Sequence, residues 1–318
     1  MTVEGEALAF HAVYPEKVSV TVDYGRGRNA YAAAEAIHRV AKIANPGGIL
    51  HMVGGSGVTT YQFRHELNAS RVTFWYATEA ESVRAGAGVQ DALVALAGTG
   101  AFGHLHVAGK GWHADGYGPL MGDWGGGYQI GREGLRAALR SFIHPHRDTA
   151  LRIALAREMG VTETDPGLQS VMITEGIRIF ADRPAVAGHA GMVDWAARQG
   201  DAVAIRILEQ AAGELAETLQ LLVERAGVGG EPLPFVGSGG VIQKSDVYWD
   251  SLVRSVTAFL PRCRPIRQTL PQSAGLAMAG LAQAVEAGEA KADVEKARAR
   301  LFETLPKLVK ADRRKGAA

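Results

Sequence analysis

A short glycine-rich turn is the first feature of this sequence that could do chemistry. Gly98, Thr99 and Gly100 directly follow the apolar run 92–97, ALVALA. Backbone N–H groups and a hydroxyl can approach an anion closely in such a turn, because no bulky side chain blocks the way. The turn therefore indicates an anion site, although Gly-Thr-Gly turns are also common in loops that bind nothing.

Histidine and cysteine offer no comparable metal site. His104 and His106 fall on one face of an expected strand, and His144 and His146 lie two residues apart. A zinc site needs at least a third protein ligand, which neither pair has nearby. The single cysteine, Cys263, excludes an internal disulfide framework and a cysteine-based metal cluster. We therefore predict no metal site built by the protein alone.

The elements that must hold the turn alternate between strand and helix. In the first part of the chain, apolar and alternating patterns predict four strands and an Ala-rich helix, at 6–13, 17–24, 48–53, 71–76 and about 29–43 respectively. A similar series begins at residue 92. The later strands are expected at 92–97, in a hairpin over 103–114, and at 233–237 and 262–267.

Helices complete the second series. Residues 132–227 are expected to be mainly helical, with an amphipathic pattern at 201–225, and further helices are expected at 245–258 and from about 273. Strands that alternate with helices predict an α/β protein, here with two related lobes. Periodicity alone leaves an ordinary Rossmann-like pair of domains as an alternative.

Composition limits the classes of partner. The 318 residues include 34 basic and 33 acidic residues, and the basic cluster Lys310–Lys315 is typical of a solvated helix end. A nucleic-acid partner is therefore not expected. No run of about 18 apolar residues and no basic-then-apolar leader is present in the printed sequence. We expect a cytoplasmic protein without a membrane partner.

Residues 116–132 resemble one known family. They read Gly116-Tyr117-Gly118, then Gly122-Asp123-Trp124-Gly125-Gly126-Gly127, then Ile130-Gly131-Arg132. In the N-acetylglucosamine kinase and BadF/BadG/BcrA/BcrD-type ATPase family, a Gly-Trp-Gly segment precedes a Gly-Asp-Glu-Gly-Ser-Gly segment and a helix that begins Ile-Gly-Arg. The same order stands here just after a Gly-Thr-Gly strand end, and the likeness covers about residues 6–285.

The resemblance implies a fold and a division of the chain. The fold is α/β and two-lobed, the actin-like (ribonuclease H-like) ATPase fold, with a ligand cleft between the lobes. Residues 1–91 would form the first lobe, 92–285 the second lobe with a helical insertion, and 286–318 a charged helical tail. Members begin with a strand ending in Asp-Gly-Gly-Gly-Thr, where this sequence has Met1–Glu6. We therefore expect the first lobe to lack its first strand.

The resemblance also implies the position of a nucleotide. The phosphates of ATP, with Mg²⁺, would lie at Gly98, Thr99 and Gly100. The segment 235–241, FVGSGGV, is similar to the family's adenosine-binding strand and diglycine turn, so Gly239 and Gly240 would lie beneath the adenosine.

The remaining expected roles concern a sugar. Gly116, Tyr117 and Asp123 would line the sugar pocket, and Glu79 or Asp123 would accept the proton of the sugar hydroxyl. Glu79 stands where the family has an aspartate, and Trp124 stands where it has a glutamate. Structural alternatives remain for each: core packing for Tyr117, a helix N-cap for Asp123 and a surface position at a helix start for Glu79.

The function implied is ATP-dependent phosphorylation of a small-molecule sugar or amino sugar. One alternative is a pseudokinase of the same fold that binds a sugar or regulates a partner. Another is an ATPase that needs no sugar. Proteins with this fold often form dimers, which leaves a homodimer open.

Overall fold

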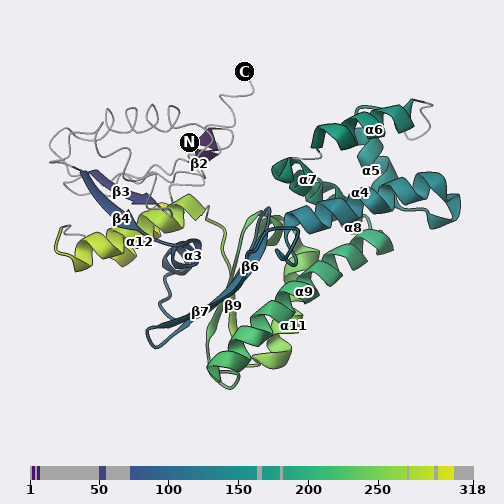
Figure 1. Ribbon diagram of the computed structural model, residues 1–318. Helices are drawn as coiled ribbons and strands as arrows, with labels where there is room; N and C mark the ends of the chain where they lie inside the picture. Colours follow the sequence, from purple (N-terminus) through teal and green to yellow (C-terminus); the bar gives the residue numbers. More distant parts are fainter. Residues whose placement is uncertain are drawn as a thin grey trace. The chain divides into compact units, whose positions relative to one another are not determined.

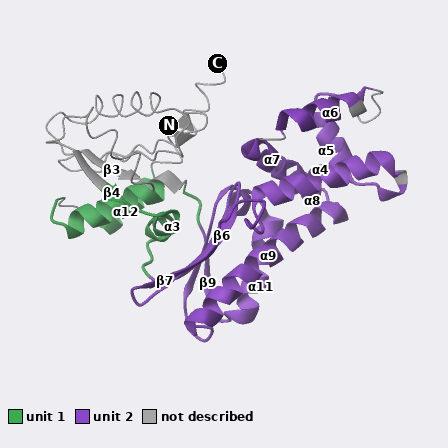
Figure 2. Cartoon of the chain, viewed as in Figure 1, with its two compact units in different colours: residues 1–90, 268–318 green, residues 91–267 purple. Residues whose placement is uncertain are grey.

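The computed structural model describes residues 2–3, 6–7, 50–54, 72–162, 167–179, 182–270, 272–289 and 293–303 (Figure 1). Its contacts divide the chain into two compact units, residues 1–90 with 268–318 (unit 1) and residues 91–267 (unit 2) (Figure 2). The break after residue 90 adjoins the predicted boundary after residue 91. At the other end the structure differs from the expected division, because residues 268–318 group with unit 1.

A parallel strand pair and two helices form the described part of unit 1. β3 (Leu50–Gly54) pairs in parallel with β4 (Val72–Tyr76), and both agree with predicted strands. α3 (Glu79–Ala87) follows β4, and α12 (Gln272–Glu286) packs against α3, β3 and β4. This packing is the reason why residues 268–285 belong to unit 1.

The beginning of unit 1 is described only in part. β1 (Thr2–Val3) and β2 (Glu6–Ala7) form a short antiparallel pair. Of the strand predicted at 6–13, only residues 6–7 are described. The strand predicted at 17–24 and the helix at 29–43 lie outside the described residues, so they stay predictions.

Small residues let α3 and α12 approach closely. A Cβ atom on Gly275 of α12 would lie 2.1 Å from the backbone oxygen of Ser82 in α3. The helical segment 294–303 joins the same unit, because Ala297 and Leu301 are buried in a cluster with Met278 of α12. Residues 294–303 of the expected tail are therefore helical.

A mixed five-stranded sheet forms the centre of unit 2. Its order is β7-β6-β5-β8-β9. β5 (Ala92–Ala97), β6 (Ala101–Val107) and β7 (Lys110–Asp115) are antiparallel neighbours, which confirms the predicted hairpin. β8 (Pro234–Ser238) runs parallel to β5 and to β9 (Arg264–Arg267). The central β5 is almost entirely buried, as its continuous apolar sequence predicts.

Helices cover this sheet and build the predicted insertion (Figure 1). They are α4 (Gly127–Ile143), α5 (Ala150–Glu158), α6 (Leu168–Ile179), α7 (Arg183–Gly188), α8 (Ala190–Arg198), α9 (Ala202–Ala226), α10 (Gly240–Lys244) and α11 (Asp246–Phe259), with a 3-10 turn at Pro145–Arg147.

α9, the longest of the described helices, illustrates how the sequence determines where a helix begins and ends. Asp201 caps its N-terminus by accepting a hydrogen bond of 2.8 Å from the Ala204 N–H, and Gly227 ends it in a left-handed conformation. Its apolar face, which includes Leu215 and Leu219, is buried in the core of unit 2. α9 lies against β6 and β7 on this face and against α11.

Candidate functional site

Two predicted glycine turns meet at one edge of the unit 2 sheet. β5 and β8 are parallel neighbours, with Leu96 opposite Ser238, so the turns that follow them begin side by side. A Cβ atom on Gly239 would lie 2.3 Å from the backbone oxygen of Ala97. The sheet therefore brings the Gly98–Gly100 turn and the Gly239–Gly240 turn together, although they are far apart in sequence.

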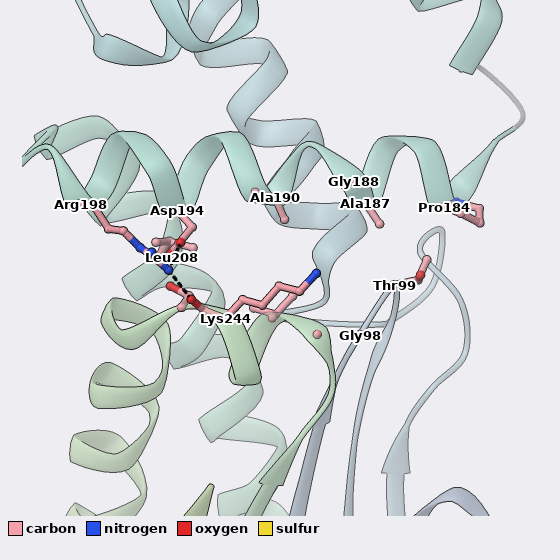
Figure 3. Close-up of a pocket in the computed structure, with 14 residues that line it drawn as sticks. Gly98, Thr99, Pro184, Ala187, Gly188, Ala190, Asp194, Arg198, Leu208 and Lys244 are labelled. Atoms are coloured by element: carbon pink, nitrogen blue, oxygen red, sulfur yellow. Dashed lines mark hydrogen bonds and ion pairs between the residues drawn. The ribbon is translucent and has the colours of Figure 1, made fainter. Parts of the chain in front are cut away.

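A pocket of about 750 Å³ opens between these turns and the helices of the insertion. Such a volume is typical of a site for a small molecule. Figure 3 shows the pocket between the Gly98–Thr99 turn, α10 and the α7–α8 segment. Its lining residues are Gly98, Thr99, Pro184, Ala187, Gly188, Ala190, Gly191, Asp194, Arg198, Leu208, Gly240, Val241, Lys244 and Ser245.

Four glycines in this lining leave space that no protein atom fills. A Cβ atom on Gly98, Gly188, Gly191 or Gly240 would meet nothing within 4 Å. None of the four has a positive φ, so a backbone conformation does not require glycine there either. Their missing side chains instead leave the backbone open to the pocket, as a close-fitting ligand would need.

Asp123 lies beside the first turn. A Cβ atom on Gly100 would lie 2.3 Å from Asp123 Oδ2, so the carboxylate occupies the space that a side chain at position 100 would need. Asp123 is 6% exposed, and it accepts a hydrogen bond of 2.8 Å from Arg183 Nη2 and one of 3.2 Å from the Gly118 N–H. The N-cap of α4 is Gly126, so the helix-cap alternative for Asp123 is wrong.

Asp115 fixes the loop that carries Asp123. Its Oδ1 atom accepts hydrogen bonds of 2.7 Å from the N–H groups of Gly116 and Asp123, and its Oδ2 atom accepts one of 2.8 Å from the Trp124 N–H. One buried carboxylate thus satisfies three backbone donors. The role of Asp115 was not predicted, because these bonds join residues up to nine positions apart.

The glycine run after Asp123 allows α4 to dock on the first turn. The Gly127 and Tyr128 N–H groups donate to the Gly98 and Thr99 carbonyls over 2.8 Å and 2.9 Å. A Cβ atom on Gly126 would lie 2.7 Å from the Gly100 carbonyl carbon. Glycine is required here by close backbone approach, and the first N–H groups of α4 obtain partners in return.

Gly125 is held by a hydrogen bond from α11. It has a φ of 85°, and its carbonyl accepts a hydrogen bond of 2.9 Å from the Tyr248 hydroxyl. Tyr248 is fully buried, and burial raises the pKa of its phenol well above the ordinary range. The phenol therefore stays protonated, and so a hydrogen-bond donor, across the pH range in which proteins are usually studied.

Glu79 begins α3 in unit 1. The capping of this helix uses other residues: Thr78 accepts from the Glu81 N–H at 3.2 Å, and the Thr78 N–H donates to Glu81 Oε2 at 2.6 Å. Among the described residues, no hydrogen bond or ion pair engages the exposed Glu79 carboxylate. This exposure agrees with the structural alternative, a surface carboxylate at a helix start. Because Thr78 and Glu81 cap the helix, the Glu79 carboxylate is also available for chemistry.

The expected sugar-contacting residues lie on the loop between β7 and α4. Gly116 has a φ of 84°, which only glycine adopts easily. The Tyr117 side chain is 67% exposed, so the core-packing alternative for this residue is wrong. Trp124 is 50% exposed and does not line the pocket described above.

Three ionisable side chains in the pocket were not predicted. Asp194 and Arg198 of α8 form an ion pair of 2.7 Å, and Lys244 ends α10. Lys244 could have been found from the sequence, because it lies four residues after Gly240. That spacing places two residues on the same helix face.

Histidine geometry agrees with ordinary structural roles. His106 bonds Asp91 at 3.0 Å, and the rings of His144 and His146 lie 5.6 Å apart. Within the described residues, no group of three or more His, Cys, Asp or Glu side chains could hold a metal ion. The same part of the chain contains no helix long and apolar enough to span a membrane.

The chain is similar to a known ATPase family and to two kinases. The model of the BadF/BadG/BcrA/BcrD ATPase family matches residues 22–258. An N-acetyl-D-glucosamine kinase of Dictyostelium discoideum is 27% identical over 196 residues, 59% of each chain. An N-acetylmuramic acid/N-acetylglucosamine kinase of Clostridium acetobutylicum is 26% identical over 178 residues, 56% of each chain. The matched region thus spans less than two thirds of either relative.

A solved structure supports the fold independently. A protein provisionally named N-acetylglucosamine kinase, from Chromobacterium violaceum, superposes with a TM-score of 0.57 and 20% identity. The match covers 80% of this chain and 86% of that one. Together with the family match, it confirms the actin-like α/β fold class that the sequence predicts.

Proposed function

Since this chain belongs to the BadF/BadG/BcrA/BcrD ATPase family, we propose that it transfers a phosphoryl group from ATP to a hydroxyl of an amino sugar of the N-acetylglucosamine class. The observation that carries this proposal is the pocket in which the two predicted glycine turns meet, with the Asp123 carboxylate fixed beside one of them. The names of the two relatives, both N-acetylglucosamine kinases, support the substrate class.

The nucleotide would lie in the 750 Å³ pocket of unit 2. Its phosphates would approach Gly98, Thr99 and Gly100, and its adenosine would lie over Gly239 and Gly240. The open Cβ positions of Gly98 and Gly240 support this placement, because they leave room for a ligand against the backbone. Mg²⁺ would arrive with the phosphates, since this ion is commonly held by substrate phosphates and one or two carboxylates.

The sugar would contact the loop that Asp115 fixes. The exposed Tyr117 ring offers an apolar face for a sugar ring, and Gly116 leaves the neighbouring backbone accessible. The Asp123 carboxylate would accept a hydrogen bond from a sugar hydroxyl. Its bond to Arg183 holds it in place, so little conformational freedom is lost when the sugar binds.

Glu79 is the better candidate for the base. Asp123 already binds Arg183, whereas the Glu79 carboxylate is free of hydrogen bonds to the described residues. In the reaction, the sugar oxygen would bond to the γ-phosphorus as the bond from that phosphorus to the ADP oxygen breaks. The hydroxyl proton would pass to Glu79. Positioning and electrostatics supply most of the catalysis in such transfers.

The test is sugar-dependent release of ADP from MgATP, with N-acetylglucosamine, glucosamine, glucose and no sugar. Glu79→Gln should lower turnover by about 100-fold or more, the effect of removing a general base. Glu81→Gln is the matched control on the same helical turn, because glutamine also serves in a capping box.

Other outcomes would distinguish an ATPase, a pseudokinase and a kinase with a different base. ADP release without sugar would favour an ATPase, and sugar binding without any ADP release would favour a pseudokinase. Full activity in Glu79→Gln, with activity lost in Asp123→Asn, would assign the base to Asp123 instead.

A further inference from the structure

Lys244 brings a positive charge into a pocket whose other charges cancel. Asp194 and Arg198 form an ion pair of 2.7 Å, so Lys244 leaves the lining with a net charge of one positive unit. Figure 3 shows the Lys244 side chain extending from α10 into the space bordered by Gly98, Ala187 and Ala190. We propose that Lys244 binds a phosphate group of the nucleotide in this pocket, an inference that rests on the function proposed above.

The ammonium group is available for such a contact. Within the described residues, Lys244 Nζ makes no hydrogen bond or ion pair. Asp194 is the acidic side chain of the lining; its Oδ2 atom is engaged by Arg198, and its Oδ1 atom is buried without a hydrogen-bond partner. Within the described lining, Arg198 already neutralises the Asp194 carboxylate, so the positive charge of Lys244 has no ion-pair partner there.

The backbone of Lys244 is fixed, although its ammonium group has no partner among the described residues. The Lys244 carbonyl accepts a hydrogen bond of 2.5 Å from Arg198 Nη2, which joins the end of α10 to α8. Ser245 then caps α11 by accepting a hydrogen bond of 3.3 Å from the Tyr248 N–H. Arg198 is thus a positioning residue: it ties down the backbone from which Lys244 extends.

The chemistry of lysine favours a phosphate over the rest of a nucleotide. An ammonium group has three donors and no acceptor, and it binds phosphate as a point charge. Adenosine is neutral and would gain at most an ordinary hydrogen bond from it. In Figure 3 the side chain starts beside Arg198 and points toward the Gly98–Thr99 turn, where the phosphates are expected.

The experiment is isothermal titration of the full chain with MgADP and, separately, with adenosine. Lys244→Met should weaken MgADP binding about 10-fold or more, since a charge-assisted hydrogen bond is lost. Adenosine affinity should stay unchanged, and Lys244→Arg should restore most of the MgADP affinity. Lys110→Met is the matched control, because Lys110 is an exposed lysine of unit 2 that does not line the pocket.

Two results would overturn the inference while leaving the proposed function intact. In the first, Lys244→Met binds MgADP as tightly as the wild type does. In the second, it loses affinity for adenosine as much as for MgADP, which would assign Lys244 to the shape of the pocket. A wild-type chain that binds neither ligand would overturn both the inference and the nucleotide site itself.

Discussion

Two groups of glycines in unit 2 lie at or around the Gly98–Gly100 turn. Around Asp123, a Cβ atom on Gly100, Gly125 or Gly126 would lie within 3 Å of other atoms of the protein. In the pocket wall, a Cβ atom on Gly98 or Gly240 would meet nothing within 4 Å. The first group is needed for packing, whereas the second group leaves space that the protein does not use.

This difference separates glycines that are needed for packing from glycines that are available for ligand binding. Substitution in the packed group should lower stability, and any loss of ligand binding would follow from that. Substitution in the open group should lower ligand affinity and leave stability nearly unchanged. The largest effects are expected in the packed group.

Gly125→Ala should lower the free energy of unfolding by about 3 kcal/mol or more. Alanine is strained at the φ of 85°, and its Cβ atom would lie 2.5 Å from the Ala211 carbonyl oxygen. Denaturant unfolding followed by circular dichroism measures the loss. Gly213→Ala, where a Cβ atom in α9 would meet nothing within 4 Å, is the control and should be neutral or stabilising. Equal stability of the two variants would contradict the packing argument.

Asp115→Asn should destabilise the protein by about 2 kcal/mol, because an amide NH₂ would face a backbone N–H donor. The loop from Gly116 to Trp124 would lose part of its support, so the KM for the sugar should also rise. Asp250→Asn is a suitable control, since Asp250 is exposed on α11. If both variants unfold like the wild type, Asp115 does not fix the loop.

Tyr248→Phe should cost about 1 kcal/mol at neutral pH, since it removes the donor to the Gly125 carbonyl. The effect should depend on pH. Burial raises the pKa of Tyr248 in the folded protein, so above about pH 10 only the unfolded chain releases this proton. Stability from Tyr248 is therefore present below that pH and is lost as the pH rises.

The free energy of unfolding of the wild type should therefore exceed that of Tyr248→Phe by less at alkaline pH than at neutral pH. Unfolding of both proteins at about pH 7, 9 and 11 measures the difference in stability. A difference that stays constant over this range would show that the phenol ionises equally in both states.

Much of the fold could be predicted from local patterns. The continuous apolar run of β5 and the amphipathic pattern of α9 each identify one element without reference to the rest of the chain. The unit to which α12 belongs could not be predicted, because an apolar helix face does not reveal which partner it covers. That outcome depends on small residues such as Gly275 facing Ser82.

The parts of the candidate site that would act through backbone groups could be predicted from the sequence. Gly98 and Gly240 could be assigned to one site because they follow strands in a recognisable order, and parallel strands end at the same edge. Arg183 was missed because its bond to Asp123 spans 60 positions and has no sequence signature. Trp124 remains without a structural explanation.

The most direct test of the account compares nucleotide binding with stability in Gly240→Ala. Gly240 begins α10, and a Cβ atom there would point into open space. We predict a free energy of unfolding within about 0.5 kcal/mol of the wild type and an affinity for MgADP about 10-fold weaker. Unchanged MgADP affinity, or loss of stability with no specific loss of binding, would contradict the claim that the open glycines form a nucleotide site.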